Sequence, residues 1–198
     1  HMTLTCLLPA AGASSRMRGG DKLMELINAI PCLAVIAQRA KRAGMEVIVT
    51  VPSLDHPRAH ALRTSDVRLL EVPDASEGMA ASLRTGISAV QHLSEGVMIL
   101  PPDMPAIETD DLVTLIGVFN GNPEHIVQAA TQDGISGHPV IFPKRLLSEF
   151  AQLSGDRGAA KIVETHRESV VTVKLDGNRA RLDLDTPEAW AEWRASLL

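Results

Sequence analysis

The chain has 198 residues, a formal net charge of −5 and 45% apolar residues, but only 3% aromatic residues. We expect residues 3–198 to form one domain with a substantial core, and His1 and Met2 to be the remnant of a cleaved tag. Basic residues do not cluster with aromatics, and apolar runs such as residues 97–100 are short, which disfavours nucleic acid and a membrane as partners.

Short apolar, β-branched runs alternate along the chain with Ala-rich segments of helical period. Strands are predicted at residues 4–8, 46–51, 67–72, 97–100, 126–130, 169–173 and 181–184, with another beginning near Gly137. Helices are predicted at residues 32–43, 57–63, 80–93, 109–119, 144–153 and 187–197. This alternation predicts an α/β fold in which helices cover both faces of a mostly parallel sheet.

The chain has two cysteines, Cys6 in a predicted strand and Cys32 at a predicted helix start. So few cysteines indicate a reduced, cytoplasmic protein without disulfides, and both positions fit small core residues better than nucleophiles.

The first predicted strand leads into a loop of small residues. It runs through Pro9, Ala10, Ala11, Gly12, Ala13, Ser14, Ser15 and Arg16 to Lys22. Small side chains let backbone amides approach an anion, and the two cations add positive charge, so the loop is predicted to hold phosphates. Asp21 precedes Lys22 where a Walker A loop needs glycine, and the glycine spacing does not match a dinucleotide site.

A second candidate lies directly after the strand at residues 97–100, where Asp103 is flanked by prolines. Asp103 could cap the helix predicted near Thr109, or it could hold Mg²⁺ against phosphates bound by the first loop. Because ligands bind at the carboxyl ends of parallel strands, the two loops favour the metal-binding interpretation.

Near the C-terminus, Asp183 and Asp185 are predicted to share one face of a strand, with Asp185 or Thr186 capping the last helix. One carboxylate from each of two strands, together with phosphate oxygens, suffices for Mg²⁺, and we favour Asp185 over Asp183 as the ligand partner of Asp103.

Three further segments depend on this nucleotide site for their interpretation. Gly78 to Ser82 opens a helix and, beside a nucleotide, becomes a base or ribose pocket; alone it is an ordinary glycine turn. His138 could contact an anionic acceptor or bond only to backbone. The turn at Asp156 and Arg157 could close over the acceptor or lie exposed.

His56 and His60 fit a solvated helix face, without the third ligand that zinc needs.

Taken together these motifs resemble the MobA-like nucleotidyltransferases. The resemblance rests on Ala10-Ala11-Gly12-x-Ser14-x-Arg16-Met17 with Lys22, Gly78-x-x-x-Ser82-Leu83, Pro102-Asp103-Met104-Pro105, Gly137-His138-Pro139-Val140, Gly155-Asp156-x-Gly158-Ala159 and Asp183-x-Asp185-Thr186-Pro187. These matches occur in family order from residue 4 to about residue 190. The family fold implied is a Rossmann-like three-layer α/β/α sandwich, like that of nucleotide-diphospho-sugar transferases.

The resemblance implies transfer of a nucleotidyl group from a nucleoside triphosphate to an acceptor phosphate, with release of pyrophosphate. The loop from Pro9 to Arg16 would wrap the triphosphate, Arg16 and Lys22 would neutralise it, and Asp103 and Asp185 would hold Mg²⁺. Gly78 and Ser82 would belong to the nucleotide site, and His138 and Asp156 to the acceptor site.

Within the family, Ala11-Gly12 and the Gly78 to Ser82 segment follow the cytidylyl pattern rather than the guanylyl pattern. That implies CTP as donor, molybdopterin carrying molybdenum as acceptor, and a molybdenum hydroxylase as a partner. Transfer of a cytidylyl or guanylyl group to a sugar or polyol phosphate, and a non-catalytic carrier of molybdenum cofactor, stay open as alternatives. Arg18 departs from the glycine of many relatives, and either contacts phosphate or changes the shape of the loop.

Overall fold

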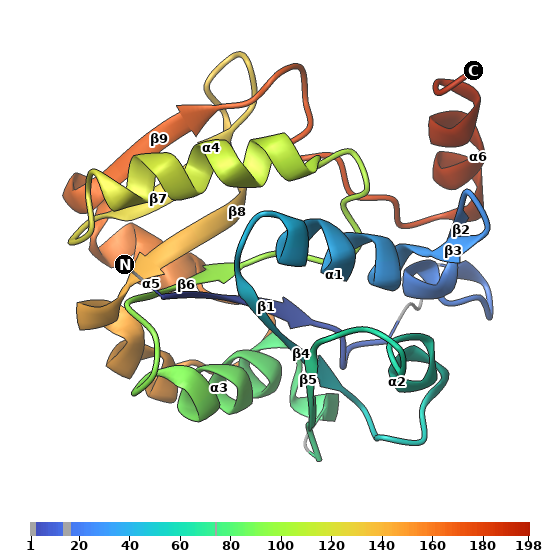
Figure 1. Cartoon of the computed structure of the whole chain (residues 1–198), viewed down its shortest axis with the longest axis horizontal. Coiled ribbons are helices and arrows are strands. Elements are labelled where there is room, and N and C mark those ends of the chain that lie inside the picture. The colour runs from blue at the N-terminus through green and yellow to red at the C-terminus, as the bar shows by residue number, and fades with distance from the viewer. Residues whose placement is uncertain (1–2, 14–16, 74) are drawn as a thin grey trace.

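The computed structural model describes residues 3–13, 17–73 and 75–198, which are built around a seven-stranded sheet (Figure 1). The strands, in the order in which they lie side by side, are β5 (Arg68–Glu71), β4 (Glu46–Val51), β1 (Leu4–Pro9), β6 (Gly96–Ile99), β8 (Ser136–Pro143), β7 (Ile126–Ala130) and β9 (Val170–Lys174). Strand β8 runs antiparallel to both β6 and β7. The other neighbours pair in parallel, so the sheet is mostly parallel, as predicted.

Helices cover both faces of this sheet (Figure 1). They are α1 (Cys32–Arg42), α2 (Pro57–Ala61), α3 (Met79–Val90), α4 (Thr109–Asn120), α5 (Ala160–Thr165) and α6 (Pro187–Ala195), with 3-10 helices at Lys22–Met24, Ala75–Glu77, Lys144–Gln152 and Arg167–Ser169. One core cluster joins the sheet to α1, α4 and α6, and a second joins it to α3, α5 and the 3-10 helix Lys144–Gln152. The three-layer sandwich is therefore confirmed.

Strand β1 shows why two cores form. Successive strand residues face opposite sides of a sheet. Cys6 and Leu8 accordingly lie in the core under α1 and α4, and Leu7 lies in the core under α3. A Cβ at Gly86 of α3 would lie 2.6 Å from the methyl groups of Leu7, so the glycine lets this helix pack closely on β1 without displacing that side chain. Cys6 and Cys32 are both fully buried, which confirms them as core residues.

Several elements differ from the sequence prediction, and helix α5 (Ala160–Thr165) is not among the predicted helices. The predicted helix at residues 144–153 is a 3-10 helix, Lys144–Gln152, which buries Phe150 against Phe142 of β8 with ring centroids 5.0 Å apart. Residues 181–184 were predicted as a strand but form turn and irregular backbone. A small hairpin of β2 (Leu26–Ile27) and β3 (Ile30–Pro31) was not predicted, and its turn gives Asn28 and Ala29 positive φ angles.

Among the helices of the described ranges, none is both long enough and apolar enough to cross a membrane.

Candidate active site

The site lies at the edge of the sheet where β1 and β6 end. These strands are parallel neighbours, and β4 flanks β1 on its other side, so the chain changes direction across the sheet at β1. Ligands of open α/β sheets bind at such switch points, beyond the carboxyl ends of the strands. Pro9 ends β1, Ala10 and Ala11 are buried, and Gly12 and Ala13 are exposed. The predicted phosphate contacts Ser14, Ser15 and Arg16 lie outside the described residues.

Three carboxylates meet at this edge. One oxygen of each of Asp103, Asp183 and Asp185 lies within 4.8 Å of the others. Asp103 and Asp185 were the predicted pair of metal ligands, and the structure adds Asp183, which the sequence analysis ranked below Asp185. Carboxylate oxygens are the ligands that Mg²⁺ and similar hard cations prefer, so the chemistry of this group fits a divalent metal.

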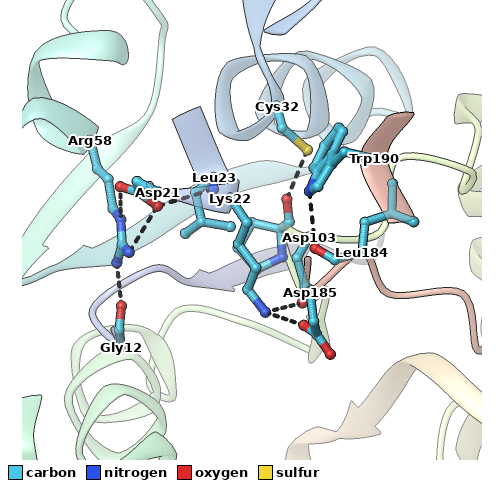
Figure 2. Close-up of polar contacts among 11 residues, drawn as sticks. Gly12, Asp21, Lys22, Leu23, Cys32, Arg58, Asp103, Leu184, Asp185 and Trp190 are labelled. Atoms are coloured by element: carbon cyan, nitrogen blue, oxygen red, sulfur yellow. Dashed lines mark hydrogen bonds and ion pairs between the residues drawn. The ribbon is translucent and has the colours of Figure 1, made fainter. Parts of the chain in front are cut away.

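Hydrogen bonds between the segment around Leu184 and the loop after β6 bring Asp103 and Asp185 together (Figure 2). The amide of Leu184 donates to the carbonyl of Asp103 at 3.4 Å, and the indole Nε1 of the buried Trp190 donates to the carbonyl of Leu184 at 3.0 Å. On the other side, Sγ of Cys32 donates to the carbonyl of Pro102 at 3.3 Å. The prediction that a shared strand face aligns Asp183 and Asp185 was wrong, because residues 181–184 form no strand and these hydrogen bonds hold the segment instead.

The helix caps remove the structural alternative for Asp103. Helix α4 is capped by Glu108, which forms a capping box with Asp111. Helix α6 is capped by Thr186, whose Oγ1 accepts from the amide of Ala189 at 3.2 Å, as predicted. Asp103 caps neither helix.

Lys22 joins two of the carboxylates. Its Nζ donates to Oδ2 of Asp103 at 2.8 Å and to Oδ1 of Asp185 at 2.6 Å (Figure 2). Burial alone would lower the pKa of Lys22, but the charges and hydrogen bonds of Asp103 and Asp185 outweigh it and raise that pKa. The lysine therefore stays charged, and it can balance negative charge at the position where the carboxylates converge.

Burial and neighbouring charge both act on the protonation of Asp183. Desolvation raises its pKa, and the negative charges of Asp185 and Asp103 raise it further. Carboxylates so close together repel one another unless a cation lies between them. Lys22 supplies such a cation to Asp103 and Asp185.

Arg58, in the first turn of α2, is a functional candidate that the sequence analysis missed. Its side chain is only 4% exposed and pairs with Asp21, which directly precedes Lys22. The sequence carried one signal, because a cation is unfavourable beside a helix N-terminus unless a specific partner holds it there.

The start of α3 connects the loop after β1 to the predicted acceptor segment. Ala81 packs with Ala11 and Val72 in a small apolar cluster. Gly78 has φ +97, and a Cβ there would lie 1.9 Å from Oδ1 of Asp156, so this position requires glycine. Ser82 is 3% exposed, which leaves its hydroxyl little surface to offer a nucleotide in this conformation.

A cleft of about 580 Å³ opens beside the carboxylates. Predicted site residues from distant parts of the chain line it, namely Pro9, Asp103, His138 and Asp156. Desolvation lowers the pKa of His138, with Arg181 acting in the same direction against Asp103 and Asp183, so its imidazole is neutral at pH 7.

Arg18, the residue that departs from the family pattern, pairs with helix α6. Its guanidinium lies 2.5 Å from Oε1 of Glu188, and both side chains are largely exposed. Its φ of 51° shows that it also shapes the loop. The hydrogen bond from Arg18 lowers the pKa of Glu188.

Comparisons with known proteins show which proteins this chain is similar to. A curated relative, molybdenum cofactor cytidylyltransferase of Escherichia coli K12, is 23% identical over 93% of this chain and 92% of its own length. Rv0371c of Mycobacterium tuberculosis H37Rv has a crystal structure that matches with a TM-score of 0.81 and 28% identity over 96% of both chains. Its complex with manganese matches with a TM-score of 0.78 and 26% identity over 98% of this chain and 99% of that chain.

The model of the MobA-like NTP transferase domain matches residues 6–170, which include the loop after β1, Asp103 and the cleft residues His138 and Asp156. The chain therefore belongs to the MobA-like NTP transferase family and is a nucleotidyltransferase.

Proposed function

We propose that this enzyme transfers CMP from CTP to molybdenum cofactor, with Mg²⁺ bound and with release of pyrophosphate. The observation that carries the proposal is the meeting of Lys22, Asp103 and Asp185 directly beside the loop after β1. A metal and a triphosphate need the same edge of the sheet, and this edge offers oxygen ligands and a cation together.

Asp103 and Asp185 would hold the metal ion, with Asp183 beside them. Their oxygens are close enough to share one cation, and a relative of known structure has been crystallised with manganese. A bound Mg²⁺ would neutralise phosphate charge and polarise the phosphorus that is attacked.

The loop after β1 would hold the triphosphate through backbone amides. A Cβ placed on Gly12 would meet no described atom within 4 Å beyond its chain neighbours, so the missing side chain leaves room for a ligand. Lys22 would neutralise the triphosphate, as would Arg16, which the sequence places in the same loop.

The reaction itself needs placement and charge balance more than covalent chemistry. An oxygen of the acceptor phosphate attacks the α-phosphorus, the bond to the bridging oxygen breaks, and pyrophosphate leaves with the bonding electrons. The contribution of this chain would be to align the two phosphates and to neutralise their charge.

The cleft supports an acceptor with a flat, apolar body and an anionic group. Its walls include apolar side chains such as Leu83, Val140 and Phe142, and arginines line it as well, among them Arg167 and Arg181. Molybdopterin has a ring system and a phosphate, which match these two features. His138 and Asp156 would contact it, a neutral imidazole being able to donate one hydrogen bond and accept another.

The choice of CTP rests on two segments that touch each other. Ala11 and Ala81 belong to the loop and to the start of α3, the two places where the sequence resembles the cytidylyl pattern, and they pack together. The similarity to a curated cytidylyltransferase supports the same base. A cytoplasmic location and delivery to a molybdenum hydroxylase belong to this proposal.

Pyrophosphate release tests the proposal. Purified enzyme with Mg²⁺ is supplied with CTP, GTP or ATP, each with molybdenum cofactor or with a sugar or polyol phosphate. We expect rapid release of pyrophosphate only in the mixture of CTP and molybdenum cofactor. Release from GTP alone would overturn the base, and release with a polyol phosphate alone would overturn the acceptor. Tight binding of molybdenum cofactor without any nucleotide binding would favour a carrier.

A further inference from the structure

Arg58 is a buried cation at the edge of the nucleotide loop. It lies in the first turn of the short helix α2 and is 3% exposed. Burying a guanidinium is costly unless its donors are paired, so its contacts indicate what it is there to hold.

Those contacts reach both ends of the loop between β1 and Lys22 (Figure 2). Nη1 of Arg58 donates to the carbonyl of Ala10 at 2.7 Å and to that of Gly12 at 2.6 Å. Nε and Nη2 donate to the two carboxylate oxygens of Asp21 at 2.8 Å and 3.0 Å. This paired geometry fixes the direction of both groups as well as their distance.

The two carbonyl contacts orient the amides of the loop. In a trans peptide the C=O and the following N–H point in opposite directions. With the carbonyls of Ala10 and Gly12 turned toward Arg58, the amides of Ala11 and Ala13 point away from it. Backbone amides with a common direction are what a phosphate needs.

The contact with Asp21 sets the position of Lys22. Oδ1 of Asp21 also accepts from the amide of Leu23 at 3.1 Å and so caps the 3-10 helix Lys22–Met24 (Figure 2). Because Asp21 is adjacent to Lys22, fixing its carboxylate fixes where the lysine leaves the backbone.

We propose that Arg58 is a positioning residue that holds the loop after β1 in its nucleotide-binding conformation. This proposal rests on the proposed function, since it assigns the loop to the triphosphate. Arg58 acts through the backbone and through Asp21, so its loss weakens nucleotide binding while the acceptor cleft keeps its shape.

Three variants and one matched control test this role. Arg58→Met removes the guanidinium, and Arg58→Lys keeps the positive charge without the paired hydrogen bonds to Asp21. Asp21→Asn keeps the cap of the 3-10 helix Lys22–Met24 but weakens the ion pair with Arg58. The control is Arg145→Met, because Arg145 donates to the carbonyl of Glu124 at 2.9 Å beyond the end of β8, at the opposite edge of the sheet.

Two measurements separate loop order from catalysis. The first is tryptic cleavage after the exposed Arg18, followed by mass spectrometry, with the melting temperature recorded for each variant. The second is KM for CTP and for the acceptor. We expect Arg58→Met to be cleaved faster and to raise KM for CTP about tenfold or more, with KM for the acceptor within about twofold of wild type. For Arg58→Lys and Asp21→Asn, we expect the cleavage rate and the KM for CTP to lie between those of wild type and of Arg58→Met. For Arg145→Met, both should equal those of wild type.

The outcomes distinguish this proposal from the proposed function. If the Arg58 variants fold and bind nucleotide as wild type does, or if both KM values rise together, the positioning role is overturned. If wild type binds none of CTP, GTP and ATP, the proposed function fails and takes this role with it. If Arg58→Met does not fold, the KM split in Arg58→Lys and Asp21→Asn decides the outcome.

Discussion

At the scale of single residues, the site depends on how Asp103 and its neighbours balance charge. Asp103 accepts from Lys22 and lies next to Asp183 and Asp185. Removing one negative charge changes both the attraction for a cation and the partner of the lysine.

Asp103→Asn keeps the shape of the side chain but removes its charge. We expect the Mn²⁺ affinity, measured by calorimetry, to fall by more than about 100-fold. Losing a residue that only hydrogen-bonds to a metal ligand costs roughly 10–100-fold, and Asp103 is proposed as a ligand itself. Pyrophosphate release should fall in parallel. Asp110→Asn, an exposed carboxylate in α4, serves as the control. Unchanged Mn²⁺ affinity in Asp103→Asn would contradict the metal role.

The two buried thiols give a prediction for alkaline pH. Burial raises the pKa of Cys32 to about 12 and raises that of Cys6 as well. Stability from a group whose pKa is raised on folding is full below its unfolded pKa and is lost as pH rises above it. The chain contains no tyrosine, so between about pH 8.5 and 10 the thiols dominate this loss.

We therefore expect the free energy of unfolding to fall above about pH 8.5, by up to about 1.4 kcal/mol per pH unit for each thiol. Urea unfolding at pH 8 and pH 10 measures the change, and the Cys6→Ala/Cys32→Ala double variant should show a smaller one. In the native protein both thiols should resist iodoacetamide, since the reactive species is the thiolate. Fast alkylation of native protein would refute this account.

At the scale of elements, helix α6 carries the indole that fixes the Asp185 segment. Trp190 is fully buried, and its Nε1 donates to Leu184. Trp190→Phe keeps most of the packing and loses this hydrogen bond.

We expect Trp190→Phe to cost about 1–3 kcal/mol of stability, because the buried carbonyl of Leu184 loses its donor, and to weaken Mn²⁺ binding through displacement of Asp185. Thermal unfolding and calorimetry measure the two effects. Trp193→Phe, in the same helix, is the control, since Trp193 packs edge-on against Trp190 with ring centroids 5.9 Å apart. Equal Mn²⁺ affinity in both variants and in wild type would show that α6 does not position the carboxylates.

Elements with their own local signals could be predicted from the sequence. Strand β4 and helix α4 begin where the pattern predicts, because apolar period and flanking polar residues agree there. Residues 181–184 could not be predicted, since alternation of polar and apolar residues resembles a strand while Leu184 is held by a tryptophan from the next helix. The hairpin turn depends on Ala29 at positive φ, which its residue type does not favour.

Within the site, too, residues with a local sequence signal could be predicted and residues held by distant partners could not. Asp103 follows an apolar strand between prolines, so its place at a sheet edge could be predicted. Arg58 could not, because its partners Ala10, Gly12 and Asp21 are far from it in sequence and two of them use only backbone oxygen.

At the scale of the whole molecule, parallel pairing brings distant loops to one edge. Strands β1 and β6 are about ninety residues apart in sequence, yet they pair directly from Leu4↔Gly96 to Leu7↔Ile99. The antiparallel strand β8 begins at this same edge, so His138 lines the cleft that opens there. The sheet thus places the loop after β1, the three carboxylates and the cleft side by side, as the proposed function requires.

The fate of labelled phosphate tests this account most directly. Enzyme with Mg²⁺ and molybdenum cofactor is given CTP labelled with ³²P at the α position or at the γ position, and the products are separated. The account predicts that the α label appears on molybdenum cofactor and the γ label in pyrophosphate. With Asp103→Asn, both labels should stay in CTP. The γ label on the acceptor, or transfer that persists in Asp103→Asn, would contradict it.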